Sequence, residues 1–247
     1  QGGMGVRTIE VYPKNLHESW FYYTKVRKFF LSLYHSKQNV MFFVQRIWNW
    51  CRRFRYRCGY GVHSPSDFFL ITSVIYEELP YYAYKTLKET PSSKSLPHYR
   101  EKVNRLLFRL VNFYHPALLV EVGEGNGESF RYMCAARPSM TSVALKGLDK
   151  DDTLCQLGKE LLKAKTLDFL HIGFTPYYKE AFEAAYPYLY EGSCVVVGDI
   201  YASEERKKWW KQLTEDERVR ISFDLYDIGI LLFEKKRFKQ NYKVNFF

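Results

Sequence analysis

The chain of 247 residues lacks long apolar runs and has few cysteines. No run approaches the ~20 apolar residues that a membrane-spanning helix requires. The N-terminus has no charged-then-apolar-then-small pattern, so we expect no secretory signal. The five cysteines include no Cys-x-x-Cys pair, and no cysteine–histidine cluster has zinc-ligand spacing. These absences argue against a membrane-spanning protein, a disulfide framework and a zinc finger, and they favour a reducing cytoplasm.

Acidic residues are scarce at the start of the chain. Residues 1–62 hold eleven Lys or Arg residues against two acids, Glu10 and Glu18, so this segment carries +9 of the total formal charge of +10. The remaining residues are close to neutral, which argues against a nucleic-acid cradle there. We therefore expect a basic, aromatic, helical extension over 1–62 and an α/β domain over 63–247.

The end of this extension has helical periodicity between residues 40 and 57. The apolar positions are Val40, Phe43, Val44, Ile47, Cys51 and Phe54, and the polar positions opposite them are Arg46, Asn49, Arg53 and Arg57. One interpretation is a helix lying on an anionic membrane surface, which could place the protein peripherally at the membrane. A second is RNA contact through arginines and stacked aromatics. A third is a helix that caps the sheet and has solvated arginines.

The most informative stretch joins an apolar run to a glycine turn. Residues 118–122 are typical of a buried parallel strand, and an amphipathic segment over 128–137 is typical of a helix. Between them stand an acid and three alternating glycines: Glu121, Gly123, Gly125 and Gly127. The dinucleotide fingerprint G-x-G-x-x-G would need a small residue at Glu128, so that fingerprint is absent. A strand, a glycine turn and a helix predict a phosphate- or nucleoside-binding corner of a doubly wound sheet.

Strand and helix patterns alternate through the rest of the chain. We expect strands at 118–122, 141–145, 167–172, 193–197, 219–225 and 228–233, and helices at 65–78, 98–113, 128–137, 153–165, 178–189 and 203–213. The last two strands are joined by the short turn Tyr226-Asp227, which predicts an antiparallel hairpin. Residues 242–247 could add an edge strand.

The acid-x-Gly-x-Gly-x-Gly pattern with a terminal antiparallel hairpin resembles class I S-adenosylmethionine-dependent methyltransferases. The resemblance implies a Rossmann-like α/β sheet with S-adenosylmethionine as cofactor. It also implies that the glycine turn lies against the methionine part and that Glu121 is near its amino group. His63-Ser64-Pro65 and the hairpin at 223–230 resemble a small-methyltransferase group of Bacteroidetes. The resemblance begins at about Met41, an alternative start, and residues 1–40 lie outside it.

The sequence departs from this family in its middle. The family places an acid at the end of the second strand to bind the ribose hydroxyls, but Lys146 stands there and cannot accept a hydrogen bond. Asp149 could replace it, or could be a solvated turn acid. Only about twenty residues separate the second strand from Leu167, which leaves room for one helical crossover. We therefore expect one edge of the sheet to be reduced.

The candidate catalytic residues are Asp199 and His63. Asp199 follows a central strand, where doubly wound folds bind their ligands, so it could act as a base or could belong to a helix cap. His63 could also be catalytic, or could order the turn before Ser64 and Pro65. Cation-dependent relatives hold a metal with several carboxylates, and Asp199 alone is too few, so we expect no metal.

Two functions remain open from the sequence. The first is methyl transfer from S-adenosylmethionine to a small molecule, of the O-methyl type, in the cytoplasm. The second is a methyltransferase-like scaffold that has lost catalysis and acts through its basic extension, at a membrane surface or with a partner.

Overall fold

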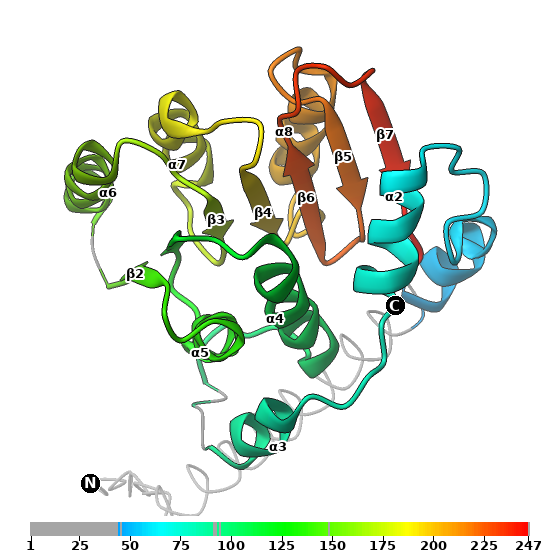
Figure 1. Ribbon diagram of the computed structural model, residues 1–247, viewed down its shortest axis with the longest axis horizontal. Coiled ribbons are helices and arrows are strands. Elements are labelled where there is room, and N and C mark those ends of the chain that lie inside the picture. The colour runs from blue at the N-terminus through cyan, green and yellow to red at the C-terminus, as the bar shows by residue number, and fades with distance from the viewer. Residues whose placement is uncertain (1–43, 45, 91–92, 94, 148, 247) are drawn as a thin grey trace, which may run out of the picture. The chain divides into compact units, whose positions relative to one another are not determined.

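The computed structural model describes residues 44, 46–90, 93, 95–147 and 149–246. Arg52–Phe247 form one compact unit around a seven-stranded sheet (Figure 1). Residues 1–40, Val40 included, lie outside the described residues, as do Phe43 and the alternative start at Met41. No helix in the described part of the chain is both long and apolar enough to span a membrane.

The strand order of the sheet is β2-β1-β3-β4-β6-β5-β7. The strands are β1 (Leu118–Val122), β2 (Thr141–Leu145), β3 (Phe169–Ile172), β4 (Cys194–Gly198), β5 (Ile221–Asp224), β6 (Ile228–Leu232) and β7 (Gln240–Lys243). The first four pair in parallel, because a helical crossover joins each to the next. Strand β6 is antiparallel to both β4 and β5, as the short connecting turn predicted.

The Rossmann-like fold with a terminal hairpin is confirmed. The expected reduction is at the β2 edge, but the sheet still has seven strands, because β7 adds one at the other edge. Among the described residues β2 pairs with β1 alone, and a single helix, α6 (Lys150–Ala164), joins β2 to β3. The seventh strand lies at the opposite edge, where β7 pairs in parallel with β5. The expected edge strand at 242–247 therefore exists, but it begins at Gln240 and ends at Lys243.

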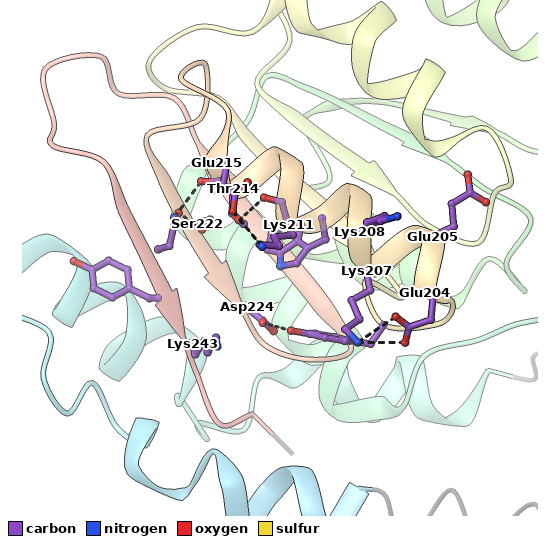
Figure 2. Close-up of a pocket in the computed structure, with 14 residues that line it drawn as sticks. Glu204, Glu205, Lys207, Lys208, Lys211, Thr214, Glu215, Ser222, Asp224 and Lys243 are labelled. Atoms are coloured by element: carbon purple, nitrogen blue, oxygen red, sulfur yellow. Dashed lines mark hydrogen bonds and ion pairs between the residues drawn. The ribbon is translucent and has the colours of Figure 1, made fainter.

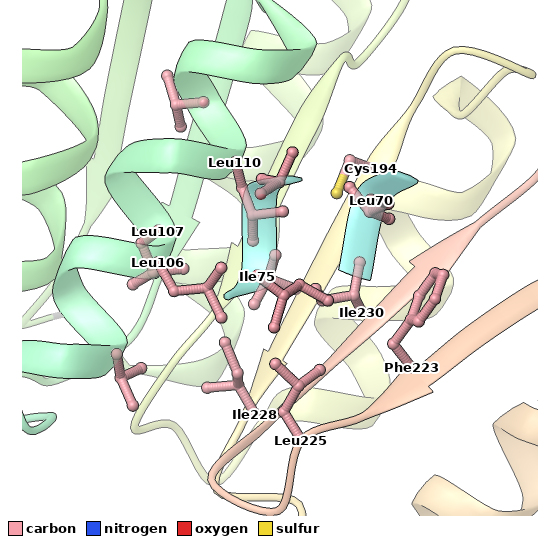
Figure 3. Packing of buried hydrophobic residues seen from close by; sticks show 14 of the residues in the cluster. Leu70, Ile75, Leu106, Leu107, Leu110, Cys194, Phe223, Leu225, Ile228 and Ile230 are labelled. Atoms are coloured by element: carbon pink, nitrogen blue, oxygen red, sulfur yellow. The ribbon is translucent and has the colours of Figure 1, made fainter. Parts of the chain in front are cut away.

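Helices cover both faces of the sheet. The helices are α2 (Pro65–Leu70), α3 (Tyr82–Glu89), α4 (Glu101–Tyr114), α5 (Glu128–Ala136), α6, α7 (Tyr178–Ala185) and α8 (Glu204–Glu215). One buried cluster joins α2, α4 and α5 to inward residues such as Leu119 and Ile230, and Figure 3 shows Leu106, Leu107 and Leu110 of α4 in it. A second cluster joins α6, α7 and α8 to the other face, through residues such as Val120 and Leu231.

The first helix of the α/β part ends earlier than its pattern predicts. Ser64 caps α2 and Pro65 is its first residue, as expected, but the α-helix ends at Leu70 and continues as a π-helix over Ile71–Ile75. The guanidinium of Arg109 on α4 donates to the carbonyl oxygens of Val74 (2.7 Å) and Ile75 (2.9 Å). These contacts satisfy backbone groups at the end of the π-helix.

The predicted faces of the segment 40–57 were wrong at Arg53. Residues 46–52 are helical and Phe54–Tyr56 form a 3-10 turn, so the α-helical period does not extend to Arg53. Arg53 is only 8% exposed and its guanidinium binds Asp224, at 2.9 Å from Oδ1 and 3.0 Å from Oδ2. The expected apolar positions Val44 and Phe54 are 57% and 54% exposed.

Candidate functional site

The glycine turn lies at the carboxyl end of the parallel strands, between β1 and α5. The backbone N–H of Gly123 donates to the carbonyl of Leu145 at the end of β2 (3.1 Å), and that of Glu124 donates to the carbonyl of Phe174 after β3 (2.8 Å). A Cβ on Gly123 would come within 2.9 Å of the Phe174 nitrogen, and Gly127 has a φ of +81°. Glycine is therefore required at 123 by close packing and favoured at 127 by backbone conformation.

Glu121 lies beneath this turn and is 9% exposed. Its Oε1 accepts hydrogen bonds from Oγ of Ser129 (2.6 Å) and from Nδ1 of His171 (2.8 Å). His171 is fully buried, and its Nε2 has no hydrogen-bond partner among the described residues.

Residues 97–100, which we call the strap, connect the glycine turn to the terminal hairpin. The carbonyl of Pro97 accepts from the backbone N–H of Asn126 (2.9 Å), and the guanidinium of Arg100 binds Asp227 (2.5 Å). Between them the ring of Tyr99 packs on Phe174, with 4.4 Å between ring centroids. The strap therefore passes over the ends of several strands.

The hydroxyl of Tyr99 lies where Gly198 leaves room for it. A Cβ on Gly198 would come within 1.7 Å of this oxygen, so a larger residue would exclude the phenol. The hydroxyl is buried and has no hydrogen-bond partner among the described residues. Burial, together with the nearby carboxylates of Asp199 and Glu121, raises the pKa of Tyr99 well above its ordinary value, so the phenol stays neutral.

Asp199 follows β4 and is half-buried. Burial and the nearby carboxylate of Asp227 together raise its pKa from 3.8 to about 6, against the opposing effects of Arg206 and His171. Its backbone N–H donates to the carbonyl of Asp227 (2.7 Å), which ties it to the hairpin turn. A carboxylate with this pKa can accept a proton near neutral pH.

Asp149 and Glu124 both lie near the end of β2. Asp149 is exposed, and its Oδ1 caps α6 by accepting from the backbone N–H of Asp152 (2.9 Å). The carboxylate of Glu124 accepts from the backbone N–H of Gly147, with distances of 2.9 and 3.1 Å to its two oxygens. Lys146, the residue after β2, is exposed.

His63 is not brought together with Asp199. It is exposed and lines a cavity of about 290 Å³ with Arg237 and Gln240, which follow the end of β6. Asp199 instead follows Gly198, which pairs with Ile228 at the start of β6. The two residues therefore lie at opposite ends of that strand, and the catalytic role of His63 stays a prediction.

A groove of about 800 Å³ lies between α8 and strands β5 and β7, away from the glycine turn (Figure 2). Asp224 and Ser222 are on its sheet side, and Lys207, Lys208 and Lys211 line it from α8. Lys207 pairs with Glu204 at 3.2 Å and Lys211 with Glu215 at 3.6 Å. The groove is therefore lined by charges of both signs.

In the described part of the chain no three His, Cys, Asp or Glu side chains are grouped to hold a metal ion. The expectation of no metal stays a prediction. The sequence interpretation missed His171, although a signal for it was present. Glu121-Val122-Gly123 and His171-Ile172-Gly173 repeat a polar-apolar-glycine ending, and Glu121 and His171 are register partners in adjacent parallel strands.

No protein-family model and no curated protein matches the chain. Several solved structures are similar. They include an O-methyltransferase from Bacillus cereus in complex with SAH (15% identity, TM-score 0.47, 65% of this chain and 95% of that chain). A methyltransferase from Geobacter sulfurreducens has 16% identity and a TM-score of 0.43, covering 62% of this chain and 92% of that chain. TomG from Streptomyces achromogenes, an O-methyltransferase of tomaymycin synthesis in complex with SAM, has 14% identity and a TM-score of 0.42, with coverages of 63% and 91%.

At these identities and TM-scores the similarities do not establish an activity for this chain. The strand order supports the fold independently of these similarities. The antiparallel strand β6 lies between β4 and β5, next to four parallel strands. The terminal antiparallel hairpin is the feature that the resemblance to class I methyltransferases predicts.

Proposed function

We propose that the protein is an S-adenosylmethionine-dependent methyltransferase that acts on a hydroxyl group of a small molecule. The observation that carries this proposal is the glycine turn at 123–127, with the buried carboxylate of Glu121 beneath it and Asp199 at the same end of the sheet. Ligands of doubly wound folds bind at this end, outside the carboxyl ends of the strands.

The glycine turn is open to a ligand at Gly127, where α5 begins, and is covered at Gly125. Nothing lies within 4 Å of a Cβ built on Gly127, so the start of α5 is open. A Cβ on Gly125 would instead meet the Phe174 ring at 3.1 Å and the carbonyl oxygen of Pro97 at 3.5 Å. The Phe174 ring therefore occupies the space next to Gly125, and it would have to move for the cofactor to bind there.

Each side chain has a distinct task in this proposal. Glu121 would hold the ammonium group of the cofactor, because a buried carboxylate favours a cationic partner. S-adenosylmethionine supplies an already activated methyl group, so the main work of the protein is alignment. Asp199 would accept the proton of the acceptor hydroxyl, and its raised pKa matches that task.

The test is calorimetric titration of the full chain with S-adenosylhomocysteine. Gly125→Val should abolish binding, because the valine side chain would occupy the space that the Phe174 ring must leave for the cofactor. Gly158→Val on α6 is the matched control, since nothing lies within 4 Å of a Cβ there. Thermal melts check that both variants fold. Wild-type affinity in Gly125→Val would contradict the placement of the cofactor, and no binding to the wild type would contradict the function.

A second candidate function is supported by the exposed residues at 52–60. Arg52, Arg55 and Arg57 are exposed, and Phe54 and Tyr60 are 54% and 80% exposed beside them. Basic and aromatic side chains together favour an anionic membrane surface, at roughly 1 kcal/mol per basic residue and with strong screening by salt. If the protein acts as such a scaffold, the variant Arg52/Arg55/Arg57→Ala should no longer co-sediment with anionic liposomes. The control variant Lys159/Lys163/Lys165→Ala should still co-sediment. Equal co-sedimentation of the two variants would contradict it.

A further inference from the structure

The glycine turn brings an acid to the place where the second strand lacks one. Strand β2 ends at Leu145, and the next residue is the exposed Lys146. The carboxylate of Glu124 lies beside Gly147, two residues past the strand, with its oxygens 2.9 and 3.1 Å from the Gly147 nitrogen. An acid is therefore present at the end of β2, although it comes from the turn after β1.

The position of Glu124 is fixed by the backbone on both sides. The turn is tied to β2 by the hydrogen bond from Gly123 to Leu145 and to the loop after β3 by the bond from Glu124 to Phe174. The Gly147 N–H orients the carboxylate itself. Held in this way, the side chain loses little conformational entropy when it binds a ligand.

Space and spare hydrogen-bonding capacity are both present there. Gly147 has a φ of +71° and nothing within 4 Å of a Cβ built on it, so the region beside the carboxylate is open. An ionised carboxylate offers about four lone-pair sites, and one N–H donor uses only part of them. Asp149, the other acid near this strand end, uses its Oδ1 to cap α6.

We propose that Glu124 binds the two ribose hydroxyls of the cofactor, in place of the acid that the family carries at the end of the second strand. This inference rests on the proposed function. Two carboxylate oxygens match two adjacent hydroxyl donors, and hydrogen bonds to a charged acceptor are about twice as strong as neutral ones. Glu124 is thus a specificity residue for a ribose that carries both hydroxyls.

The experiment compares two ligands by calorimetry: S-adenosylhomocysteine and its 2′-deoxyribose analogue. The wild type should bind the ribose form more tightly, by roughly tenfold to a hundredfold for one hydrogen bond to a charged group. Glu124→Gln should lose most of this preference. Asp149→Asn and Glu128→Gln, the latter in the first turn of α5, should keep it.

The outcomes separate the two proposals. If the wild type binds neither ligand, the proposed function fails and the ribose assignment fails with it. If the wild type binds both ligands equally, or if Asp149→Asn alone loses the preference, only the assignment of Glu124 is overturned. A variant that merely disturbed the Gly147 loop would weaken the binding of both ligands alike. The ratio of the two affinities therefore reports the contact with the ribose hydroxyl. The wild-type ratio tests the assignment even if Glu124→Gln does not fold.

Discussion

Arg53 should be the most costly arginine to remove at the start of the compact unit. Its guanidinium makes two hydrogen bonds to the carboxylate of Asp224, one to the Asp224 carbonyl (3.1 Å) and one to the hydroxyl of Tyr201 (3.2 Å). It also lies 5.4 Å from the ring centroids of both Tyr201 and Tyr226, which stack on each other. The two charged side chains are 9% and 8% exposed.

The magnitude follows from what Arg53→Ala leaves behind. Among the described residues, the Asp224 carboxylate would then keep the Tyr201 hydroxyl (2.6 Å) and the Tyr226 N–H (3.0 Å) as its donors, and it would stay buried. Removing one partner of a buried ion pair costs about 3–5 kcal/mol in the free energy of unfolding. For a unit of this size each kcal/mol shifts Tm by roughly 2–4 °C, so we expect a fall of roughly 6–20 °C.

The assay is urea unfolding of the full chain, followed by tryptophan fluorescence. Arg52→Ala is the matched control, because the neighbouring Arg52 is exposed and its loss should change stability by less than about 0.5 kcal/mol. The double variant Arg53→Ala/Asp224→Ala should lose less than the sum of the single variants, because the two residues interact directly. Equal stabilities of Arg53→Ala and Arg52→Ala would refute the reasoning, and Arg53 would then be a surface arginine.

Three further changes have defined outcomes. Tyr99→Phe should retain or raise the free energy of unfolding by about 1 kcal/mol in urea titrations, because it removes a buried hydroxyl that has no described partner; a loss above 1 kcal/mol would reveal a partner. The contribution of Asp199 to the free energy of unfolding should fall as the pH rises from about 4 to about 6, because folding raises its pKa from 3.8 to about 6 and the folded state binds that proton more tightly. Urea titrations across this range should show the wild type losing stability relative to Asp199→Asn, and a constant difference between the two would contradict the shift. Gly229→Ala should cost about 1–3 kcal/mol by the same assay, since a Cβ there would come within 2.2 Å of the Trp210 ring, while Gly158→Ala on α6 should be neutral or stabilising; equal stability of the two variants would mean that α8 moves aside freely.

Much of the sheet could be predicted because its strands are locally distinct. The boundaries of β1 and β2 match the prediction, and those of β3 and β4 differ by one or two residues. Each of these strands is a short apolar run next to a glycine or a helical pattern, so a few neighbouring residues are enough to predict its boundaries. The hairpin was equally local, because its turn is too short for a crossover.

The side-chain partners could not be predicted in the same way. Arg53 and Asp224 are 171 residues apart, and nothing in the local pattern distinguishes Arg53 from Arg52 or Arg55. The helical period assigned Arg53 to a solvated face, but the helix ends before it and tertiary pairing decides its burial. Tyr99 lies in a segment with no periodic signal, and the strap is defined by contacts with distant loops.

The reduced edge and the location of the acid on the glycine turn are physically connected. Strand β2 is the outer strand on its side among the described residues, and four of its five residues are exposed or only partly buried. A side chain at the end of such a strand has a neighbouring strand on one side only, so less of its surroundings holds it in place. Glu124 instead comes from the turn after β1, which has β2 and β3 on either side and is hydrogen-bonded to both. A binding group is positioned best by rigid, supported elements, so the absence of a further outer strand favours an acid on the turn after β1 over one at the end of β2. We therefore expect that Lys146→Glu, which restores an acid at the family position, will improve the affinity for S-adenosylhomocysteine less than Glu124→Gln reduces it. Calorimetry on the two variants tests the comparison, and a larger effect at Lys146 would show that the outer strand is the better support.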